Sequence, residues 1–476
     1  MNDKIMLMVP PTRAHYVVPP VGLGYLATAL RREGFSNIFI LDGQRERLTK
    51  KSLIKILISQ KPVIVGIQVF SSGYSNTKEM IKIIKDTLPE SFVVIGGPHV
   101  TATADRVLND FLEVDFAFQG EAEPGFPLLV KWILSSGISG DLPNQMADVK
   151  LENIPGLIFR EKNGIKIVKR AIVENLDELG FPAWDLMPPD SYPDVPQGAF
   201  YKRFPVAPIL TSRGCPYECA YCGSPVNMTR HYRMRSISHV LDEIEMLMQN
   251  YGVREIHIID DMFSLKKERV LEFCDGLEKR KIDIAYTFPN GLRLDSLDKE
   301  ILRRMKETGA YAFTVGIESG SQRILDAMKK KLTLELITSK VNLIRECGLE
   351  PSGFFIIGYP GETVDDIKAT INFAKSLPLK RAHFSNFLPL PGTEATEMLY
   401  RAGEIETGNW DELSYYHVPY APRGMSKEEI KKWQRYAFLS FHLRPSILAG
   451  LIKEIKSWRH FKAIMIRARD YLFSWR

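Results

Sequence analysis

The sequence predicts an α/β protein with two parallel β-sheets and a mainly helical C-terminal region. Short apolar runs alternate with helix-like stretches from about residue 5 to 140 and again from about 207 to 395, an order typical of parallel sheets. The runs of the first series are apolar throughout, which indicates that helices cover both faces of its sheet. The length of 476 residues suits about three domains.

The first series predicts a flavodoxin-like, doubly wound sheet of five strands. The strands are expected at residues 5–11, 38–42, 63–69, 92–98 and 116–120. Ligands of such sheets lie beyond the carboxyl ends of the strands. Several of these ends are rich in small residues, so that a large flat ligand could approach the backbone; the alternative is a set of tight turns. The residues concerned are Gly96, Gly97 and His99 after the fourth strand, and Gly120 and Glu121 after the fifth.

The stretch between the two series is expected to form a hairpin and a linker. The segment GLIFREKNGIKIVKR (156–170) predicts a hairpin whose two-residue turn is Asn163–Gly164. Frequent proline from Phe181 to Pro208 excludes regular helix and central strand, which favours a linker laid over a surface.

The second series predicts an open, partial barrel. Its strands are expected at 207–213, 254–260, 284–290, 311–319, 351–360 and 381–389. Six such units are too few for a closed eightfold barrel, and barrel enzymes use the loops at the carboxyl ends of their strands. The expected domains are 1–140, the linker 141–206, the barrel 207–395 and the helical region 396–476.

Three of the five cysteines lie close together in RGCPYECAYCGSP, just after the first barrel strand. They are Cys215, Cys219 and Cys222. Zinc usually takes four ligands, and the next candidate is His231, nine residues further on. Iron–sulfur clusters normally use four thiolates, so three would leave one iron open to a substrate or cofactor. Spacing alone leaves both a zinc site and an iron–sulfur cluster open. Cys274 and Cys347 are expected to be ordinary helix residues.

The distribution of charge and the hydropathy of the sequence limit the expected cellular location and binding partners of the protein. The net charge of +6 resides in residues 444–476, which hold eight Lys or Arg and two acids, so a general nucleic-acid surface is not expected. The N-terminal run resembles a buried strand rather than a signal peptide, and no apolar run reaches the roughly 18–20 residues that span a bilayer. We expect a cytoplasmic protein with reduced thiols. The basic, amphipathic tail (443–476) could lie on the inner membrane surface or pack on the barrel.

The CxxxCxxC spacing, with Tyr221 before the last cysteine, resembles the radical S-adenosylmethionine (SAM) superfamily. The resemblance covers roughly residues 205–395 and implies a radical SAM partial barrel. It implies one 4Fe–4S cluster on the three cysteines, with SAM chelating the fourth iron. Electron transfer, from a donor such as flavodoxin or ferredoxin, would then cleave SAM to a 5′-deoxyadenosyl radical.

Further motifs occur at the ends of the barrel strands, where the resemblance implies contacts with SAM. They are Asp260 and Asp261 (IIDDMFS) for the methionine amino group, Asn290 and Arg293 (NGLRLD) for other polar groups, Glu318 (GIESGS) for the ribose, and Gly358 and Gly361 (FFIIGYPGET) for the adenine.

The N-terminal half is similar to the cobalamin-binding domain that precedes many such barrels. The similarity lies in PPxGLGYLA (19–27), GGPHVT (96–101) and QGEAE (119–123). The D-x-H-x-x-G signature of His-ligated cobalamin enzymes is absent, so no cobalt ligand is assigned. The alternatives are a degenerate domain that binds nothing, a turn role for His99, and helix-start roles for Glu121 and Glu123.

Cobalamin beside a radical generator implies methylation of an unactivated carbon. In the implied mechanism the 5′-deoxyadenosyl radical abstracts a substrate hydrogen, methylcobalamin supplies the methyl group, and a second SAM remethylates the cobalamin. The alternatives are a ring-forming or rearranging enzyme and a cobalamin or iron–sulfur sensor. A methylthiotransferase is disfavoured because the first 214 residues contain no cysteine for a second cluster. The expected substrate is a small molecule, lipid, pigment or peptide, and no catalytic acid or base is assigned.

Overall fold

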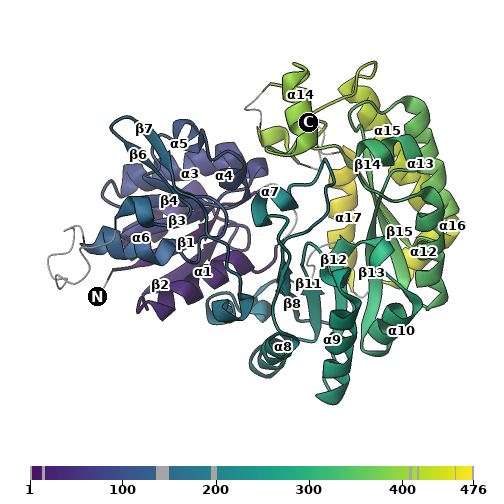
Figure 1. Cartoon of the computed structure of the whole chain (residues 1–476), viewed down its shortest axis with the longest axis horizontal. Helices are drawn as coiled ribbons and strands as arrows, with labels where there is room; N and C mark the ends of the chain where they lie inside the picture. Colours follow the sequence, from purple (N-terminus) through teal and green to yellow (C-terminus); the bar gives the residue numbers. More distant parts are fainter. Residues whose placement is uncertain are drawn as a thin grey trace. The chain divides into compact units, whose positions relative to one another are not determined.

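The computed structural model describes residues 3–12, 17–135, 150–193, 201–406, 410–414, 417–455 and 457–473 (Figure 1). The chain divides into two compact units. Unit 1 comprises residues 1–14, 19–188 and 226–229, and unit 2 comprises residues 15–18, 189–225 and 230–476. Parts of the expected linker, at 141–149 and 194–200, lie outside the described residues. Among the described helices, none is long and apolar enough to cross a membrane.

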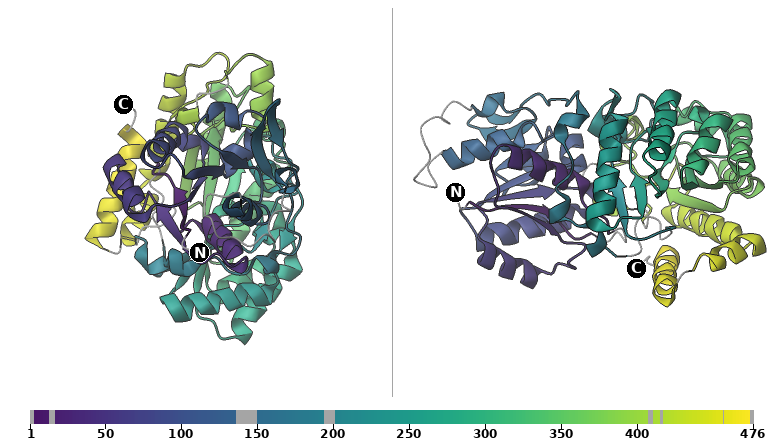
Figure 2. Two further views of the ribbon diagram at one scale, coloured as in Figure 1. Left: turned by 90° about the vertical axis from the view of Figure 1, so that its left-hand side faces the viewer. Right: turned by 90° about the horizontal axis from the view of Figure 1, so that it is seen from below.

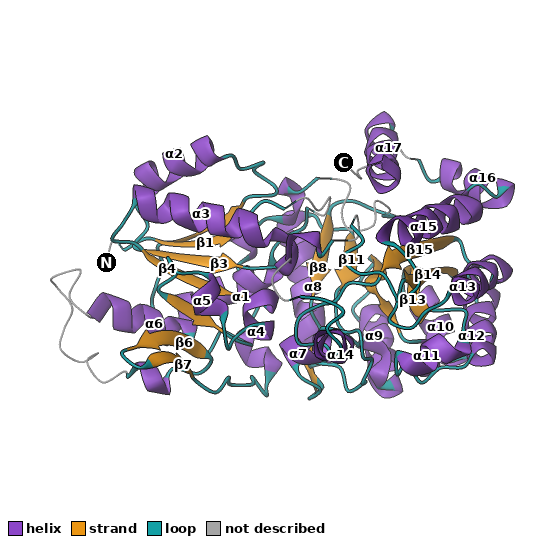
Figure 3. Ribbon diagram, turned by 90° about the horizontal axis from the view of Figure 1, so that it is seen from above, coloured by secondary structure: helices purple, strands orange, loops and turns teal. Residues whose placement is uncertain are grey.

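Unit 1 contains the expected doubly wound sheet. Its parallel strands are β1 (Ile5–Val9), β2 (Ile38–Asp42), β3 (Ile64–Gln68), β4 (Phe92–Gly96) and β5 (Phe116–Phe118), in the order β2-β1-β3-β4-β5. Figure 3 shows helices on both sides of the strands. Helices α2 (Lys50–Gln60) and α3 (Tyr74–Thr87) cover one face, and α1 (Val21–Arg32) and α6 (Phe126–Ile133) cover the other. The fully apolar strands are therefore buried on both faces, as predicted.

The hairpin differs from its prediction in two respects. Strands β6 (Leu157–Glu161) and β7 (Gly164–Ile167) join the sheet, because β6 pairs antiparallel with β5 and extends the sheet to seven strands. The pairing satisfies the open edge of β5 and buries the apolar start of β6. Glu161 pairs with Gly164, so the two loop residues are Lys162 and Asn163, one position earlier than expected.

Unit 2 contains a six-stranded parallel sheet in which each strand neighbours the next along the chain. The strands are β8 (Val206–Ile209), β11 (Glu255–Ile258), β12 (Ala285–Leu292), β13 (Ala310–Glu318), β14 (Glu350–Ile357) and β15 (Arg381–Asn386). Helices connect them: α8 (Ile237–Tyr251), α9 (Lys267–Lys279), α10 (Lys299–Glu307), α12 (Leu334–Glu346) and α13 (Val364–Ser376). This is the open partial barrel that the sequence predicts.

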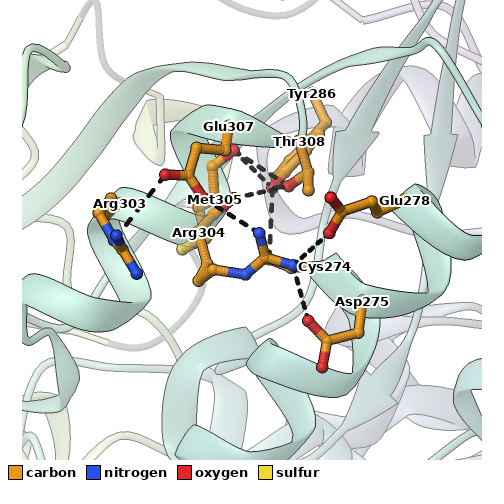
Figure 4. A network of polar contacts seen from close by, with 9 residues as sticks. All are labelled: Cys274, Asp275, Glu278, Tyr286, Arg303, Arg304, Met305, Glu307 and Thr308. Atoms are coloured by element: carbon orange, nitrogen blue, oxygen red, sulfur yellow. Dashed lines mark hydrogen bonds and ion pairs between the residues drawn. The ribbon is translucent and has the colours of Figure 1, made fainter.

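The helix-facing side of this sheet is closed by aromatic packing and polar contacts. The ring centroids of Phe355 and Phe384 lie 5.1 Å apart. The Tyr286 hydroxyl donates to the Met305 carbonyl at 2.9 Å, and Cys274 is fully buried beside it (Figure 4). Arg304 of α10 pairs with two acids of α9. Cys274 is thus a core residue, as expected.

The C-terminal helices cover the edge strand β15. Gln434 of α15 (Lys427–His442) donates to the Phe384 carbonyl at 2.9 Å, which occupies an open edge of the sheet. The tail forms two helices, α16 (Pro445–Lys453) and α17 (Trp458–Phe473) (Figure 2). Glu454 follows α16 and pairs with Lys380 and with Arg381 at the start of β15.

Candidate functional site

The three clustered cysteines lie in one loop of unit 2, between β9 (Ser212–Arg213) and α7 (Ser224–Met228). All three thiols are free and partly buried. Burial raises the pKa of Cys215 to about 11 and raises that of Cys222. Such thiols become thiolates beside a strong positive charge, as iron ions provide. No three His, Cys, Asp or Glu side chains in the described part of the chain form a single-ion site.

Two adjacent acids hold the ends of this cysteine loop. Asp260 is buried and accepts hydrogen bonds from the Thr211 amide, the Thr211 hydroxyl and the Ser212 hydroxyl, each at 2.6 Å. Asp261 accepts from the Ser224 hydroxyl at 2.6 Å. Burial raises the pKa of both carboxyl groups, and these hydrogen bonds oppose it. Asp260 therefore clamps the loop before the cysteines, and Asp261 clamps it after them.

Arg293 lies against the cysteine loop. Its guanidinium group stacks on the Tyr217 ring, 3.7 Å from the centroid, and its Nη1 lies 4.0 Å from the Cys219 sulfur. Its Nη2 donates to the Lys330 carbonyl at 2.6 Å. A guanidinium group held in this way places a permanent positive charge beside the thiols.

Glu318, at the end of β13, forms a buried ion pair with Lys330. The Lys330 ammonium donates to Glu318 Oε1 at 2.8 Å and to the Tyr221 hydroxyl at 3.1 Å, and each side chain of the pair is 9% exposed. Burial opposes the charge on Lys330, but the Glu318 carboxylate outweighs burial and holds the lysine pKa above its ordinary value. Lys330 is not among the residues predicted from the sequence, because nothing distinguishes it from its neighbours in MKKKL.

The remaining predicted SAM residues lie at the ends of β12 and β14. The exposed Asn290 donates from Nδ2 to the Ile259 carbonyl at 2.7 Å. Gly358 and Gly361 have φ angles of +83° and +76°, which favour glycine. Glu362, also missed, closes this turn: its Oε2 accepts from the Gly358 amide at 2.5 Å, and its Oε1 is buried without a hydrogen-bond partner among the described residues. Burial raises the pKa of Glu362 to about 8.

We expect Glu362 to make the stability of the protein depend on pH. Its folded-state pKa lies above its unfolded value, so the stabilisation is fully present below the unfolded pKa and is lost as pH rises through about 8. The wild-type free energy of unfolding should therefore fall by up to about 1.4 kcal/mol per pH unit between pH 6 and 8. Urea unfolding of the cluster-loaded protein under anaerobic conditions measures this slope. Glu362→Gln should flatten it, whereas the exposed control Glu335→Gln should not. Equal slopes in wild type and Glu362→Gln would contradict the assignment.

The carboxyl edge of the unit 1 sheet is rich in small residues. Gly97 has a φ angle of +102°, and a Cβ there would lie 3.1 Å from the Val69 carbonyl oxygen. Gly96 and Gly120 are partly accessible, and Phe70 is 40% exposed after β3. A flat macrocycle fits such an edge, because small residues allow close approach and an aromatic side chain offers apolar contact.

His99 and Glu121 lie behind this edge. His99 is fully buried, its Nδ1 lies 2.9 Å from the Ser71 hydroxyl, and burial, with a smaller contribution from Arg106, lowers its pKa to about 4. Glu121 is buried and accepts from the Val173 amide at 2.7 Å. Both side chains therefore support the edge from within.

Comparisons with known proteins agree with this arrangement. Residues 209–374 match the Radical SAM superfamily, and residues 12–130 match the B12 binding domain. The uncharacterized methyltransferase PH0819 of Pyrococcus horikoshii is 34% identical over 98% of this chain and 97% of its own length. Cytidylyl-2-hydroxyethylphosphonate methyltransferase of Streptomyces wedmorensis is 29% identical over 84% of this chain and 80% of its own. The cobalamin-dependent SAM radical enzyme OxsB has the same fold, with a TM-score of 0.74 and 17% identity over 98% of this chain and 72% of OxsB.

The chain therefore belongs to the cobalamin-dependent radical SAM enzymes. Within that family it is a methyltransferase that uses a 4Fe–4S cluster, SAM and cobalamin.

Proposed function

We propose that Cys215, Cys219 and Cys222 hold the 4Fe–4S cluster for methylation of a small organic molecule. The observation that carries this proposal is one loop with three thiols, clamped at both ends by Asp260 and Asp261. When bound, the cluster, SAM and cobalamin supply reductive cleavage and a transferable methyl group. The electron would come from a partner such as flavodoxin or ferredoxin. The protein itself binds and orients the cofactors and the substrate, and it excludes water from the site of reaction.

The SAM-binding roles follow from charge and position. Asp261 receives the methionine amino group, because the oxygens of Asp260 are already occupied by Thr211 and Ser212. Lys330 and Arg293 offer positive charge to the methionine carboxylate, and Glu318 binds the ribose. At the neighbouring strand ends, Asn290 offers polar contact, and the turn from Gly358 to Gly361 presents backbone to the adenine.

Cobalamin binding is assigned to the carboxyl edge of unit 1. Gly96 and Gly97 allow the corrin to approach the backbone, Phe70 packs against the corrin, and Gly120 lies beside them against the Arg170 side chain. His99 and Glu121 act through their partners, since both side chains are buried and hydrogen-bonded.

Anaerobic reconstitution tests this function. The protein is loaded with iron, sulfide, SAM and hydroxocobalamin, then supplied with reductant and with extracts that contain lipid, pigment and peptide. Mass spectrometry should find a product that has gained one CH₂, together with 5′-deoxyadenosine. Formation of 5′-deoxyadenosine with a product that gains no CH₂ would instead establish the ring-forming alternative.

We also propose that the tail binds an anionic membrane surface peripherally. Ile452 of α16 and Trp458 of α17 are 58% and 77% exposed, and lysine and arginine side chains are interspersed among the apolar residues. Exposed aromatic and aliphatic side chains beside cations suit the headgroup region of anionic lipids. Arg444 donates to the Lys375 carbonyl at 2.8 Å, which supports the alternative of simple packing.

Liposome flotation distinguishes these two roles of the tail. We expect the wild-type protein to float with anionic liposomes at low salt, and less at physiological salt, because screening weakens the attraction. Serine at Ile452 and Trp458 should weaken binding at least about tenfold, since each buried side chain contributes about 1.5–3 kcal/mol. The control is Ile58→Ser in α2, where the isoleucine is 57% exposed. If the wild-type protein does not float with the liposomes at either salt concentration, the tail does not bind membranes and only packs on the barrel.

A further inference from the structure

Arg293 follows strand β12 and lies beside the cysteine loop, with its side chain only 7% exposed. Protein contacts fix its guanidinium group on three sides. Nε donates to the Asp295 carboxylate at 3.0 Å, Nη2 donates to the Lys330 carbonyl at 2.6 Å, and the Tyr217 ring covers one face at 3.7 Å. The remaining nitrogen, Nη1, lies 4.0 Å from the Cys219 sulfur. The guanidinium group is therefore held with one N–H edge toward a proposed cluster ligand.

Tyr217 ties this guanidinium group to the cysteine loop. The tyrosine belongs to the loop itself, two residues after Cys215 and two before Cys219. A guanidinium group stacks well on an aromatic face, because it is both planar and positively charged. Loss of the Tyr217 ring would free the guanidinium group to move away from the Cys219 sulfur.

The other buried cation of the site is neutralised more completely than Arg293. The Lys330 ammonium donates to Glu318 at 2.8 Å, and both side chains are 9% exposed, so a buried carboxylate offsets its charge. Asp295, the carboxylate partner of Arg293, is 30% exposed, and solvent screens part of its charge. We therefore expect Arg293 to act on the Cys219 thiolate more strongly than Lys330 does.

A fixed positive charge beside a cluster thiolate affects reduction of the cluster. The reduction potentials of iron–sulfur clusters depend on net charge and on hydrogen bonds to the sulfur atoms. Reduction adds one electron and breaks no bond, so the reduced cluster carries one more negative charge than the oxidised cluster. A nearby guanidinium group stabilises the reduced form more, and its burial limits the screening of this effect.

We propose that Arg293 raises the reduction potential of the cluster through Cys219, and that Tyr217 is a positioning residue that holds the guanidinium group against this thiolate. The inference rests on the proposed cluster site. It gives Arg293 a role that is independent of its proposed contact with the methionine carboxylate. A carrier such as flavodoxin or ferredoxin would then deliver its electron to a cluster that is easier to reduce.

The test is a redox titration of the reconstituted holoenzyme, in which electron paramagnetic resonance follows the reduced cluster. SAM is omitted, so that the methionine carboxylate does not contribute. Arg293→Gln removes the charge, and Tyr217→Phe keeps the ring. Tyr217→Leu removes the ring but keeps every charge, so it measures the effect even if Arg293→Gln retains no cluster. Arg230→Gln is the matched control, because Arg230 pairs with Glu218 of the same loop but is 56% exposed.

Arg293→Gln should make the one-electron reduction about tenfold less favourable, which lowers the midpoint potential by about 59 mV. Tyr217→Leu should also lower the potential, whereas Tyr217→Phe and the control should match wild type. The double variant R293Q/Y217L should be no lower than Arg293→Gln, because Tyr217 acts through Arg293.

An unchanged potential in Arg293→Gln, or an equal shift in the Arg230→Gln control, would overturn the inference. Additive shifts in the double variant, or no shift in Tyr217→Leu, would overturn the positioning role of Tyr217. A wild-type protein that binds no cluster at all would contradict the proposed function instead.

Discussion

The triple variant C215A/C219A/C222A should fold, retain no cluster iron and lose all reductive cleavage of SAM. The loop that carries the thiols is held by contacts that do not involve them. Asp260 and Asp261 clamp its ends, and the Ala220 amide donates to the Met328 carbonyl at 3.0 Å. Removing three small sulfur atoms should therefore leave unit 2 intact while abolishing the only thiolates in the loop.

Iron content, visible absorbance and 5′-deoxyadenosine formation measure the effect of the triple variant, and circular dichroism reports on its fold. Cys347→Ala is the control, because this partly accessible cysteine caps α12, away from the loop. It should bind iron as wild type does. A triple variant with full iron content would show that the cluster ligands lie elsewhere in the chain.

Glu318→Gln should have the second-largest effect, on stability and on SAM affinity together. The substitution leaves the buried Lys330 ammonium without its carboxylate partner, and breaking a buried pair in this way costs about 3–5 kcal/mol. It also removes the acid proposed to bind the ribose. We expect a lower free energy of unfolding in urea and weaker SAM binding by calorimetry.

The double variant E318Q/K330M separates these two effects. Replacing the lysine removes the uncompensated charge, so stability should return toward the wild-type value, while SAM affinity stays low because both proposed contacts, Glu318 and Lys330, are absent. Recovery of SAM affinity in the double variant would mean that neither side chain contacts SAM. An unchanged free energy of unfolding in Glu318→Gln would mean that the ion pair is not formed in solution.

Apolar periodicity by itself predicted both sheets and their parallel order. A strand buried on both faces must be apolar throughout, and two neighbouring parallel strands require a helical crossover between them. Both features can therefore be recognised in the local sequence. The same holds for the cysteine loop, because all three thiols fall within eight residues of sequence. The Gly96–Gly97 turn also follows from local sequence, since only glycine favours the φ angle of Gly97.

Only the tertiary structure decided what depends on distant partners. The tertiary structure joined β6 to the edge of β5, and it paired Glu454 of the tail with Lys380 and Arg381. Of three consecutive lysines, the folded chain pairs Lys330 with Glu318. It also places Thr211 and Ser212 where they donate hydrogen bonds to Asp260. In each case the stabilising free energy comes from burial beside residues that are distant in the sequence. Local propensity and residue spacing carry no information about such contacts.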